Sequence, residues 1–164
     1  MPKNGEHDLL VAGLTGELTP SGHRINARVY FADTDFSGVV YHARYLEFLE
    51  RGRSDYLRLS GIHHTELADG KHGERIVWVV RRMEIDFRSP ARIDDILTIE
   101  TRTEGISGAR IFMAQQIRRD DELLIDARVE AAIIGATGRP KRFPKEWIER
   151  FVPKNEGRHG GGPA

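Results

Sequence analysis

The feature that most constrains the fold is a series of four β-strand patterns between Arg75 and Ile133. The first pattern begins with the apolar block Ile76–Val80 and then alternates from Arg82 to Arg88. In the other three, every second residue is uncharged, as in a strand that turns one face to a core and the other to water. Short polar segments such as Gly105–Gly108 and Asp120–Asp121 separate the patterns. Short turns join antiparallel strands, whereas parallel strands need long crossovers. The second half of the chain is therefore predicted to form an antiparallel sheet.

One strand and one long helix are predicted before this series. Alternation from Arg24 to Phe31 predicts the strand, and apolar residues every three or four positions from Ala43 to Ser60 predict the helix. The order strand, helix, four strands predicts an α+β fold, with about five antiparallel strands wrapped around the helix. A short helix is expected from Pro144 to near Phe151.

Several local features carry further expectations. The apolar block Ile76–Val80 predicts a strand start that is buried on both faces. Gly52 lies on the apolar side of the predicted helix, where glycine costs about 1 kcal/mol relative to alanine, so we expect a close approach of helix to sheet there. Ser60-Gly61 is expected to end the helix. The helix side that we expect to face solvent carries Arg44, Glu47, Arg51, Asp55 and Arg58.

Length and composition limit the possible functions. The 164 residues suit one domain, predicted at residues 23–152, with loosely held tails at 1–22 and 153–164. The 25 basic and 25 acidic residues cancel, so a nucleic-acid partner is not expected. The absence of cysteine excludes a thiolate metal site and a cysteine nucleophile. Without an apolar run of about 20 residues, no membrane span is predicted, and we expect a cytoplasmic protein.

The polar segment Ile62–Glu74 is predicted to be a mobile loop. It contains His63, His64 and His72. Adjacent histidines point in different directions, and no carboxylate stands at a recognisable ligand interval, so we predict no metal site.

The stretch Asp33–His42 carries the most chemistry in the smallest space. It joins the first predicted strand to the helix and contains two carboxylates, Gly38 at a turn, and a histidine. Asp35 would lie near free N–H groups at the helix start, which could hold a polarised carbonyl oxygen while the carboxylate attacks it or activates water. The alternative is structural, because Asp and Ser commonly cap turns and helices at such junctions.

The residues of this stretch also carry a family resemblance. Asp-Thr-Asp, then Gly-Val-Val-Tyr-His, then a helix with Tyr45 and Glu50-Arg51 resembles the hotdog-fold 4-hydroxybenzoyl-CoA thioesterase family. The similarity is greatest to its Tol-Pal-associated acyl-CoA thioesterase branch. The segments Val79–Asp95 and Arg139–Lys145 extend the resemblance, which covers about Arg24 to Phe151. Phe36-Ser37 departs from it, because smaller residues are expected there.

The resemblance implies a function and a set of site residues. Asp35 would be the nucleophile or general base that hydrolyses an acyl-CoA, and the backbone N–H near His42 would polarise the carbonyl. Asp33, Gly38 and Tyr41 would support the loop, and the His42 side chain is a further catalytic candidate. Coenzyme A belongs to the substrate, and no separate cofactor is expected. The basic residues that could meet its phosphates are Arg81, Arg82, Arg92, Lys141 and Arg142.

Two other functions stay open at this point. One is a hotdog module that binds an acyl chain or an acyl-carrier protein without turnover, and the other is an enoyl-thioester hydratase. For any of these functions, we expect a homo-oligomer, a tetramer built from dimers, because the sheet leaves a long edge and an apolar face unfilled.

Overall fold

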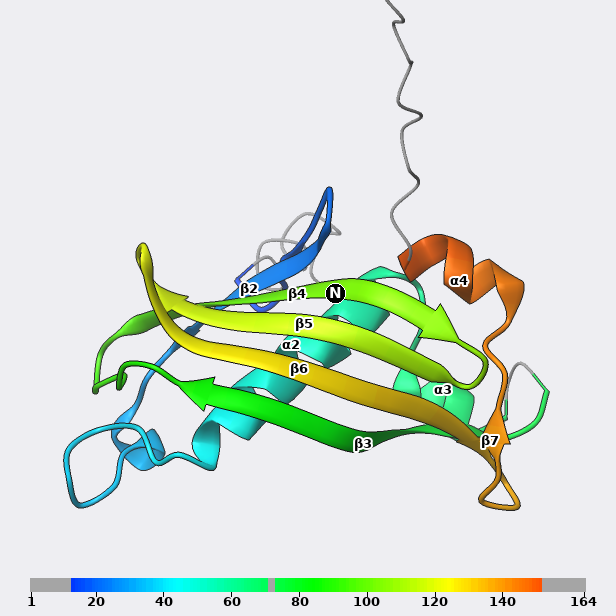
Figure 1. The fold of residues 1–164 in the computed structure, drawn as a ribbon, viewed down its shortest axis with the longest axis horizontal. Coiled ribbons are helices and arrows are strands. Elements are labelled where there is room, and N and C mark those ends of the chain that lie inside the picture. The colour runs from blue at the N-terminus through cyan, green and yellow to red at the C-terminus, as the bar shows by residue number, and fades with distance from the viewer. Residues whose placement is uncertain (1–12, 71–72, 152–164) are drawn as a thin grey trace, which may run out of the picture.

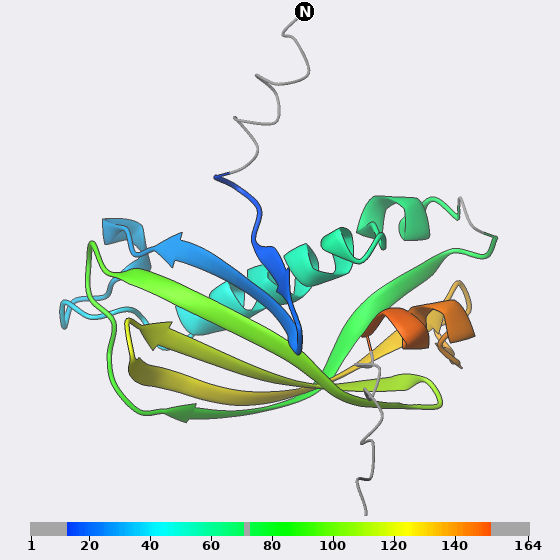
Figure 2. The ribbon, with the colours of Figure 1, turned by 90° about the horizontal axis from the view of Figure 1, so that it is seen from above.

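The computed structural model describes residues 13–70 and 73–151, and a single antiparallel sheet curves around one long helix (Figures 1 and 2). The strands are β1 (Glu17–Thr19), β2 (Gly22–Arg28), β3 (Ile76–Phe87), β4 (Ile96–Ser107), β5 (Arg110–Arg119), β6 (Glu122–Gly135) and β7 (Pro140–Lys141). The helices are α2 (Arg44–Leu59), α3 (His64–Ala68) and α4 (Lys145–Phe151). Five strands are long and two are short, which agrees with the predicted α+β fold of about five antiparallel strands around one helix.

The strand order in the sheet differs from the order along the chain. The path is β1-β2-β4-β5-β6-β3, with β7 paired to the far end of β6. Strand β3 therefore pairs with β6 and not with β4, its successor in the chain. The connection between β3 and β4 crosses the end of the sheet instead of forming a hairpin, and its Arg92 forms a β-bridge with Val39 of the Asp35 loop.

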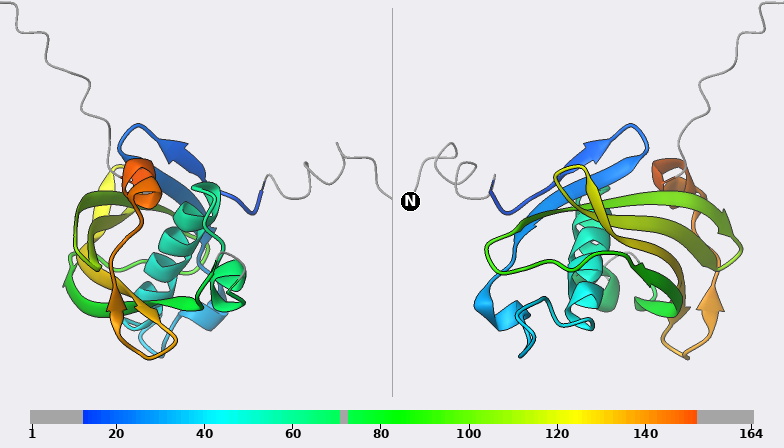
Figure 3. Two further views of the ribbon diagram at one scale, coloured as in Figure 1. Left: turned by 90° about the vertical axis from the view of Figure 1, so that its right-hand side faces the viewer. Right: turned by 60° about the vertical axis from the view of Figure 1, so that its left-hand side comes forward.

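Helix α2 lies on the concave side of the sheet, as the end-on view shows (Figure 3). The helix approaches the sheet closely at Gly52, as predicted. A Cβ added there would lie 2.8 Å from Ile99 Cγ2 and 3.1 Å from Thr101 Oγ1. Gly61 follows the helix with a φ of 82°, in the left-handed region, so the predicted helix end is confirmed. The core between helix and sheet is formed by residues such as Phe48, Leu49, Leu97, Ile99 and Ile125.

The start of β3 is not buried on both faces, as the apolar block had suggested. Val77 and Val80 keep 44% and 45% of their surface exposed. The reason is strand order, because β3 is an edge strand and one row of its backbone groups has no neighbouring strand among the described residues. An exposed strand edge of this length offers its unpaired N–H and C=O groups to another chain.

The N-terminal region also differs from the prediction. Strand β1 lies inside the predicted tail 1–22 and pairs antiparallel with β2. The first long strand ends at Arg28 and not at Phe31, which lies in a 3-10 turn and is 81% exposed. Residues 1–12 and 152–164 lie outside the described residues. The predictions for residues 1–12 and for the tail 153–164 therefore stay untested.

Two smaller elements complete the described chain. Helix α3 lies within the segment predicted to be a loop, so that prediction was wrong for His64–Ala68, while His72 is outside the described residues. The predicted C-terminal helix is present as α4, whose Phe151 is buried against Tyr56 with ring centroids 5.4 Å apart. No helix within the described ranges is long and apolar enough to cross a membrane.

Candidate active site

The segment between β2 and α2 holds the predicted catalytic residues in a tight, hydrogen-bonded loop. The Asp35 N–H donates to the Val39 carbonyl at 3.0 Å, and the Gly38 N–H donates to the Asp35 carbonyl at 3.0 Å. Gly38 has a φ of 80°, which glycine adopts without strain. The Val40 N–H donates to the Ala91 carbonyl at 2.9 Å, so the loop is anchored on the segment that joins β3 to β4.

The Asp35 carboxylate has one oxygen engaged and one available. Its Oδ1 accepts hydrogen bonds from the Ser37 backbone N–H, at 2.8 Å, and from the Ser37 hydroxyl. No partner of Oδ2 is recorded among the described residues. The two bonds from Ser37, with a smaller contribution from the charge of His42, lower the pKa of Asp35 below its ordinary value of 3.8. The group is therefore ionised at neutral pH and has an oxygen free to act.

Asp33 has a different environment, although it is only two residues away. Its Oδ2 accepts the Tyr30 backbone N–H at 2.8 Å, and its Oδ1 lies 3.5 Å from Arg44 Nε at the start of α2. These contacts tie the 3-10 turn to the helix. Asp33 therefore holds the loop in shape, with both of its oxygens in use.

The first residues before α2 provide hydrogen-bond donors. No partner is recorded for the backbone N–H groups of His42 and Ala43 within the part of the chain that the structure describes. The His42 ring contacts Tyr41, with centroids 4.6 Å apart, and Phe87, at 6.4 Å. Free N–H groups at the positive end of a helix can stabilise an oxyanion. The loop thus contains a carboxylate that can attack a carbonyl or activate water, and N–H groups that can stabilise the resulting oxyanion.

A hollow of about 260 Å³ opens beside His42, between the start of α2 and the end of β3, and Asp35 is not among the residues that line it. Its walls include His42, Tyr45 and Phe87. The Tyr45 hydroxyl accepts the Ala91 backbone N–H at 2.9 Å, which fixes the ring as a wall of the hollow. Because Phe87 ends β3, the hollow lies at one end of the free β3 edge.

The basic residues predicted to bind coenzyme A are not brought together in one chain. Arg81 and Arg82 lie near the middle of β3, at a β-bulge, and Arg82 pairs with Glu84. The backbone of Arg92 pairs with Val39, next to the loop. Lys141 lies at the opposite end of the sheet and pairs with Glu74.

Sequence reasoning missed a buried polar cluster on the other side of α2. Asp55, expected on the solvent side of the helix, is 8% exposed and accepts hydrogen bonds from His23 Nε2 at 2.8 Å and from the Gly16 N–H at 2.7 Å. Burial raises the pKa of Asp55, but these bonds and that from Arg58 outweigh it, and the net direction is down. The only sequence signal for this cluster is the alternation of β2, which places His23 on the same face of the strand as its inward residues.

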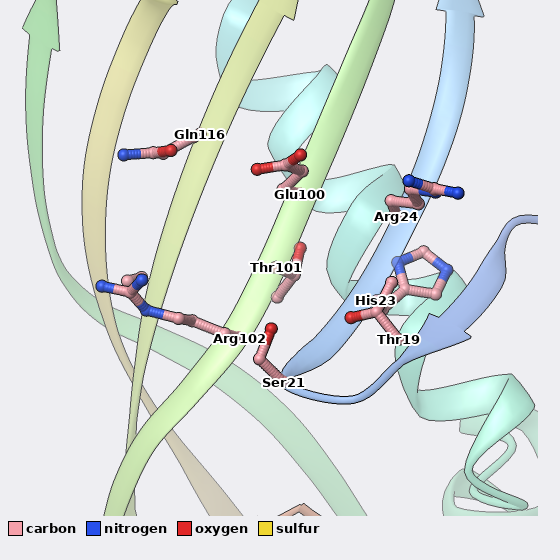
Figure 4. A pocket seen from close by; sticks show the side chains of 9 residues that line it. Thr19, Ser21, His23, Arg24, Glu100, Thr101, Arg102 and Gln116 are labelled. Atoms are coloured by element: carbon pink, nitrogen blue, oxygen red, sulfur yellow. The ribbon is translucent and has the colours of Figure 1, made fainter.

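A second hollow, of about 240 Å³, lies beside the β1–β2 hairpin (Figure 4). Arg24, Glu100, Arg102 and Gln116 line it, and they alternate along their strands with buried residues, so it lies on the face away from α2. It is at the Gly22 end of β2, whereas the Asp35 loop follows the Arg28 end. Within residues 13–70 and 73–151, no group of three or more histidine or acidic side chains could hold a metal ion.

Comparison with known proteins adds to this geometry. The family model of the thioesterase-like superfamily matches residues 29–151, which include the whole Asp35 loop. A protein from Haemophilus influenzae described as acyl-CoA thioesterase YbgC is 38% identical over 130 residues, or 79% of this chain and 93% of the relative. An acyl-CoA thioester hydrolase YbgC from Escherichia coli O6:H1 is 36% identical and covers 76% of this chain and 91% of the relative.

The structural comparison gives the same picture. The crystal structure of a probable thioesterase from Bartonella henselae has a TM-score of 0.73 and 56% sequence identity, covering 76% of this chain and 100% of that one. A thioesterase from Thermus thermophilus, solved with coenzyme A and zinc, has a TM-score of 0.66 and 26% identity, covering 82% of this chain and 93% of that one.

Proposed function

The chain belongs to the thioesterase-like superfamily, and from this membership we propose that it hydrolyses an acyl-CoA to a free acid and coenzyme A, with Asp35 as the catalytic carboxylate. The family match confirms the predicted resemblance. The observation that carries the catalytic assignment is the ionised Asp35 carboxylate, in the same loop as the backbone N–H groups of His42 and Ala43. Among the described residues, no partner is recorded for Asp35 Oδ2 or for these two N–H groups.

Two routes are consistent with this arrangement. As a nucleophile, Asp35 Oδ2 attacks the thioester carbonyl, the carbon–sulfur bond breaks, and the thiolate leaves; water then hydrolyses the mixed anhydride. As a general base, Asp35 accepts a proton from water, whose oxygen attacks the carbonyl directly. In both routes, the N–H groups before α2 stabilise the negative oxygen of the tetrahedral intermediate.

Repeated turnover in ¹⁸O-labelled water separates the two routes. Water that attacks the enzyme-side carbonyl of a mixed anhydride leaves ¹⁸O on Asp35, which peptide mass spectrometry detects. A pure general base acquires no label. Label on Asp35 rules out the base-only route, whereas unlabelled protein is compatible with both, because water can also attack the acyl-side carbonyl.

The proposed activity is tested with a panel of acyl-CoAs of different chain lengths and branching. Release of free thiol indicates hydrolysis, and loss of enoyl absorbance without thiol release indicates hydration. Saturable binding of the acyl-CoAs without either signal would support the non-hydrolytic module and refute the proposal. A carrier-protein thioester added to the same panel tests the predicted acyl-carrier-protein partner.

We also infer that two chains pair through their β3 edges. The edge is 12 residues long, it exposes Val77 and Val80, and its outer backbone groups have no partner strand among the described residues. When two copies pair in antiparallel orientation, the backbone groups of both β3 edges form hydrogen bonds. The two chains are then related by a two-fold axis. The hollow beside His42 lies at the end of this edge, so a second chain would add a wall to it. Assembly of such dimers into a tetramer and a cytoplasmic location remain predictions.

A further inference from the structure

The connector between β3 and β4, residues 88–95, supports the Asp35 loop. At its centre, the Ala91 carbonyl accepts the Val40 N–H at 2.9 Å, and the Ala91 N–H donates to the Tyr45 hydroxyl at 2.9 Å. All three of these residues are buried. Val40 lies in the loop, shortly before the N–H groups proposed to hold the oxyanion. The position of Ala91 therefore sets the position of this end of the loop.

The connector contains a turn that needs support. Asp94 has a φ of 70°, in the left-handed region, which is unfavourable for a residue with a Cβ. Such conformations persist only where surrounding contacts hold them. The Asp95 N–H closes the turn by donating to the Arg92 carbonyl at 3.2 Å, and the Arg92 N–H donates to Asp95 Oδ2 at 2.9 Å. A further contact to the Asp95 carboxylate therefore acts on the whole turn.

That further contact comes from Arg119, the last residue of β5. Its Nη1 donates to Asp95 Oδ2 at 2.6 Å and to the Pro90 carbonyl at 3.3 Å. Since Pro90 and Asp95 lie on either side of Ala91 in the chain, one guanidinium group holds the connector on both sides of the residue that supports the loop. Arg119 Nη2 donates to Glu122 Oε2 at 2.5 Å, which fixes the guanidinium group on the β5–β6 hairpin.

The charges of this ion pair act on the wall of the hollow without contacting the catalytic carboxylate. Burial raises the pKa of Asp95, but the hydrogen bonds from the Arg92 N–H and from Arg119 outweigh it, and the net direction is down. Burial also raises the pKa of Tyr45, where the charge of Arg119 lowers it and that of Asp95 raises it. Arg119 is not among the residues that line the hollow. Its influence on the site is therefore indirect.

We propose that Arg119 is a positioning residue for the reaction, which fixes the connector through Asp95 and Pro90 and thereby aligns the Asp35 carboxylate with the N–H groups before α2. The proposal rests on the proposed thioesterase function. A small displacement between an attacking group and the oxyanion donors weakens transition-state stabilisation much more than it weakens substrate binding. Loss of Arg119 should therefore lower kcat and leave KM nearly unchanged.

The first test replaces Arg119 by glutamine and measures hydrolysis of one acyl-CoA. The kcat should fall about 10-fold or more, with KM within about twofold of the parent value. The matched control is Arg110→Gln, which removes an arginine from the other end of β5, where it lies 3.0 Å from Glu130. Urea unfolding reports the folded fraction of both variants. Equal losses of kcat in the two variants, or a loss explained by unfolded protein, would overturn the proposal.

Rescue experiments show whether the missing guanidinium group is the cause. Arg119 keeps 27% of its side chain exposed, so the space left in Arg119→Ala is open to small ions. Guanidinium chloride, far below denaturing concentrations, should restore part of the kcat, whereas sodium chloride should not. Arg119→Lys should keep more activity than Arg119→Gln, because lysine can still pair with Asp95. Failure of both guanidinium and lysine to restore activity would overturn the proposal.

A double variant tests the route through Asp95. Asp95→Asn keeps the size of the side chain and removes its charge, so kcat should fall. When two residues act through one contact, their effects do not add. Arg119→Gln with Asp95→Asn should therefore be about as active as the slower single variant. A double variant whose loss is the product of the two single losses would show that the residues act separately, against the proposal.

Hydrogen–deuterium exchange separates this proposal from the proposed activity. The amides of Val40 and Ala91 should exchange faster in Arg119→Gln than in the parent or in Arg110→Gln, because the connector is less firmly held. Faster exchange in a protein that hydrolyses no thioester would refute the proposed function and retain the contact. Unchanged exchange in an active enzyme, or faster exchange without a fall in its kcat, would refute the positioning role alone.

Discussion

At the scale of single residues, the two aspartates of the loop differ in what their oxygens do. Asp35→Asn keeps the size of the side chain and removes both basicity and nucleophilicity, so hydrolysis should fall about 100-fold or more while ligand binding persists. Asp33→Asn is the matched control and should reduce the rate of hydrolysis far less, since Asp33 contacts the loop and Arg44. Steady-state rates on one acyl-CoA measure both. An Asp35→Asn rate within a few fold of the parent would contradict the assignment.

His42→Ala examines the oxyanion donor separately. The backbone N–H survives this change, so a role for the N–H alone predicts a modest loss of kcat. A loss as large as that of Asp35→Asn would mean that the ring itself transfers a proton.

The environment of Asp35 also predicts a pH dependence. Ser37 lowers the pKa of Asp35 below 3.8, and the ionised carboxylate is the active form in both routes. Activity is then fully present at neutral pH and is lost only as pH falls through the lowered pKa, so kcat/KM should show no acid limb from Asp35 between about pH 5 and 8. Ser37→Ala removes the hydroxyl donor and should move the acid limb upward. An unaltered limb in this variant would contradict the role given to Ser37.

At the scale of elements, the contact between α2 and the sheet depends on Gly52. Gly52→Ala gains about 1 kcal/mol of helix propensity. Its Cβ would lie 2.8 Å from Ile99 Cγ2, in a fully packed core, and overpacking costs roughly 1–3 kcal/mol. We expect a net loss of stability in urea unfolding. Gly105→Ala is the control, because a Cβ there meets nothing within 4 Å. Equal urea concentrations at the unfolding midpoint of the two variants would show that the helix can move away from the sheet.

Strand β1 changes what can be removed from the N-terminus. A chain that begins at Gly22 loses β1 and the Gly16 N–H that donates to the buried Asp55. Because an unsatisfied buried acceptor costs about 1–3 kcal/mol, its Tm should be several degrees below that of a chain beginning at Gly13. Thermal unfolding of the two chains at equal concentration measures this difference. Equal Tm values would support the prediction that this part of the N-terminal segment is loosely held.

At the scale of the whole molecule, the free β3 edge predicts the state of assembly. Val80→Lys places a charge on this edge, which opposes strand pairing, so light scattering should show monomers at concentrations where the parent is dimeric or larger. Ile96→Lys is the control, because Ile96 is also 45% exposed and lies in β4, between β2 and β5. A parent protein that is monomeric and fully active at micromolar concentration would end the pairing proposal.

The sequence by itself determined the local elements of this protein and the place of its site. Periodicity predicted the helix to within one residue at each end and predicted five long strands, because side-chain alternation is set by backbone geometry. Gly61 and Gly38 were predictable from the conformations that only glycine adopts easily. The Asp35 stretch indicated both the loop and the family, since its residues are contiguous.

Only the tertiary structure decided which segments meet. Alternation does not encode strand partners, so β3 could not be identified as an edge, and its apolar start was predicted to be buried. Asp55 had the spacing of a solvent-facing residue, and its burial depends on His23, 32 positions away in the chain. Lys141 had seemed a candidate for the site until the sheet separated it from Asp35. In each case the deciding contact is long-range, and a local pattern contains no information about a partner that folding alone brings near.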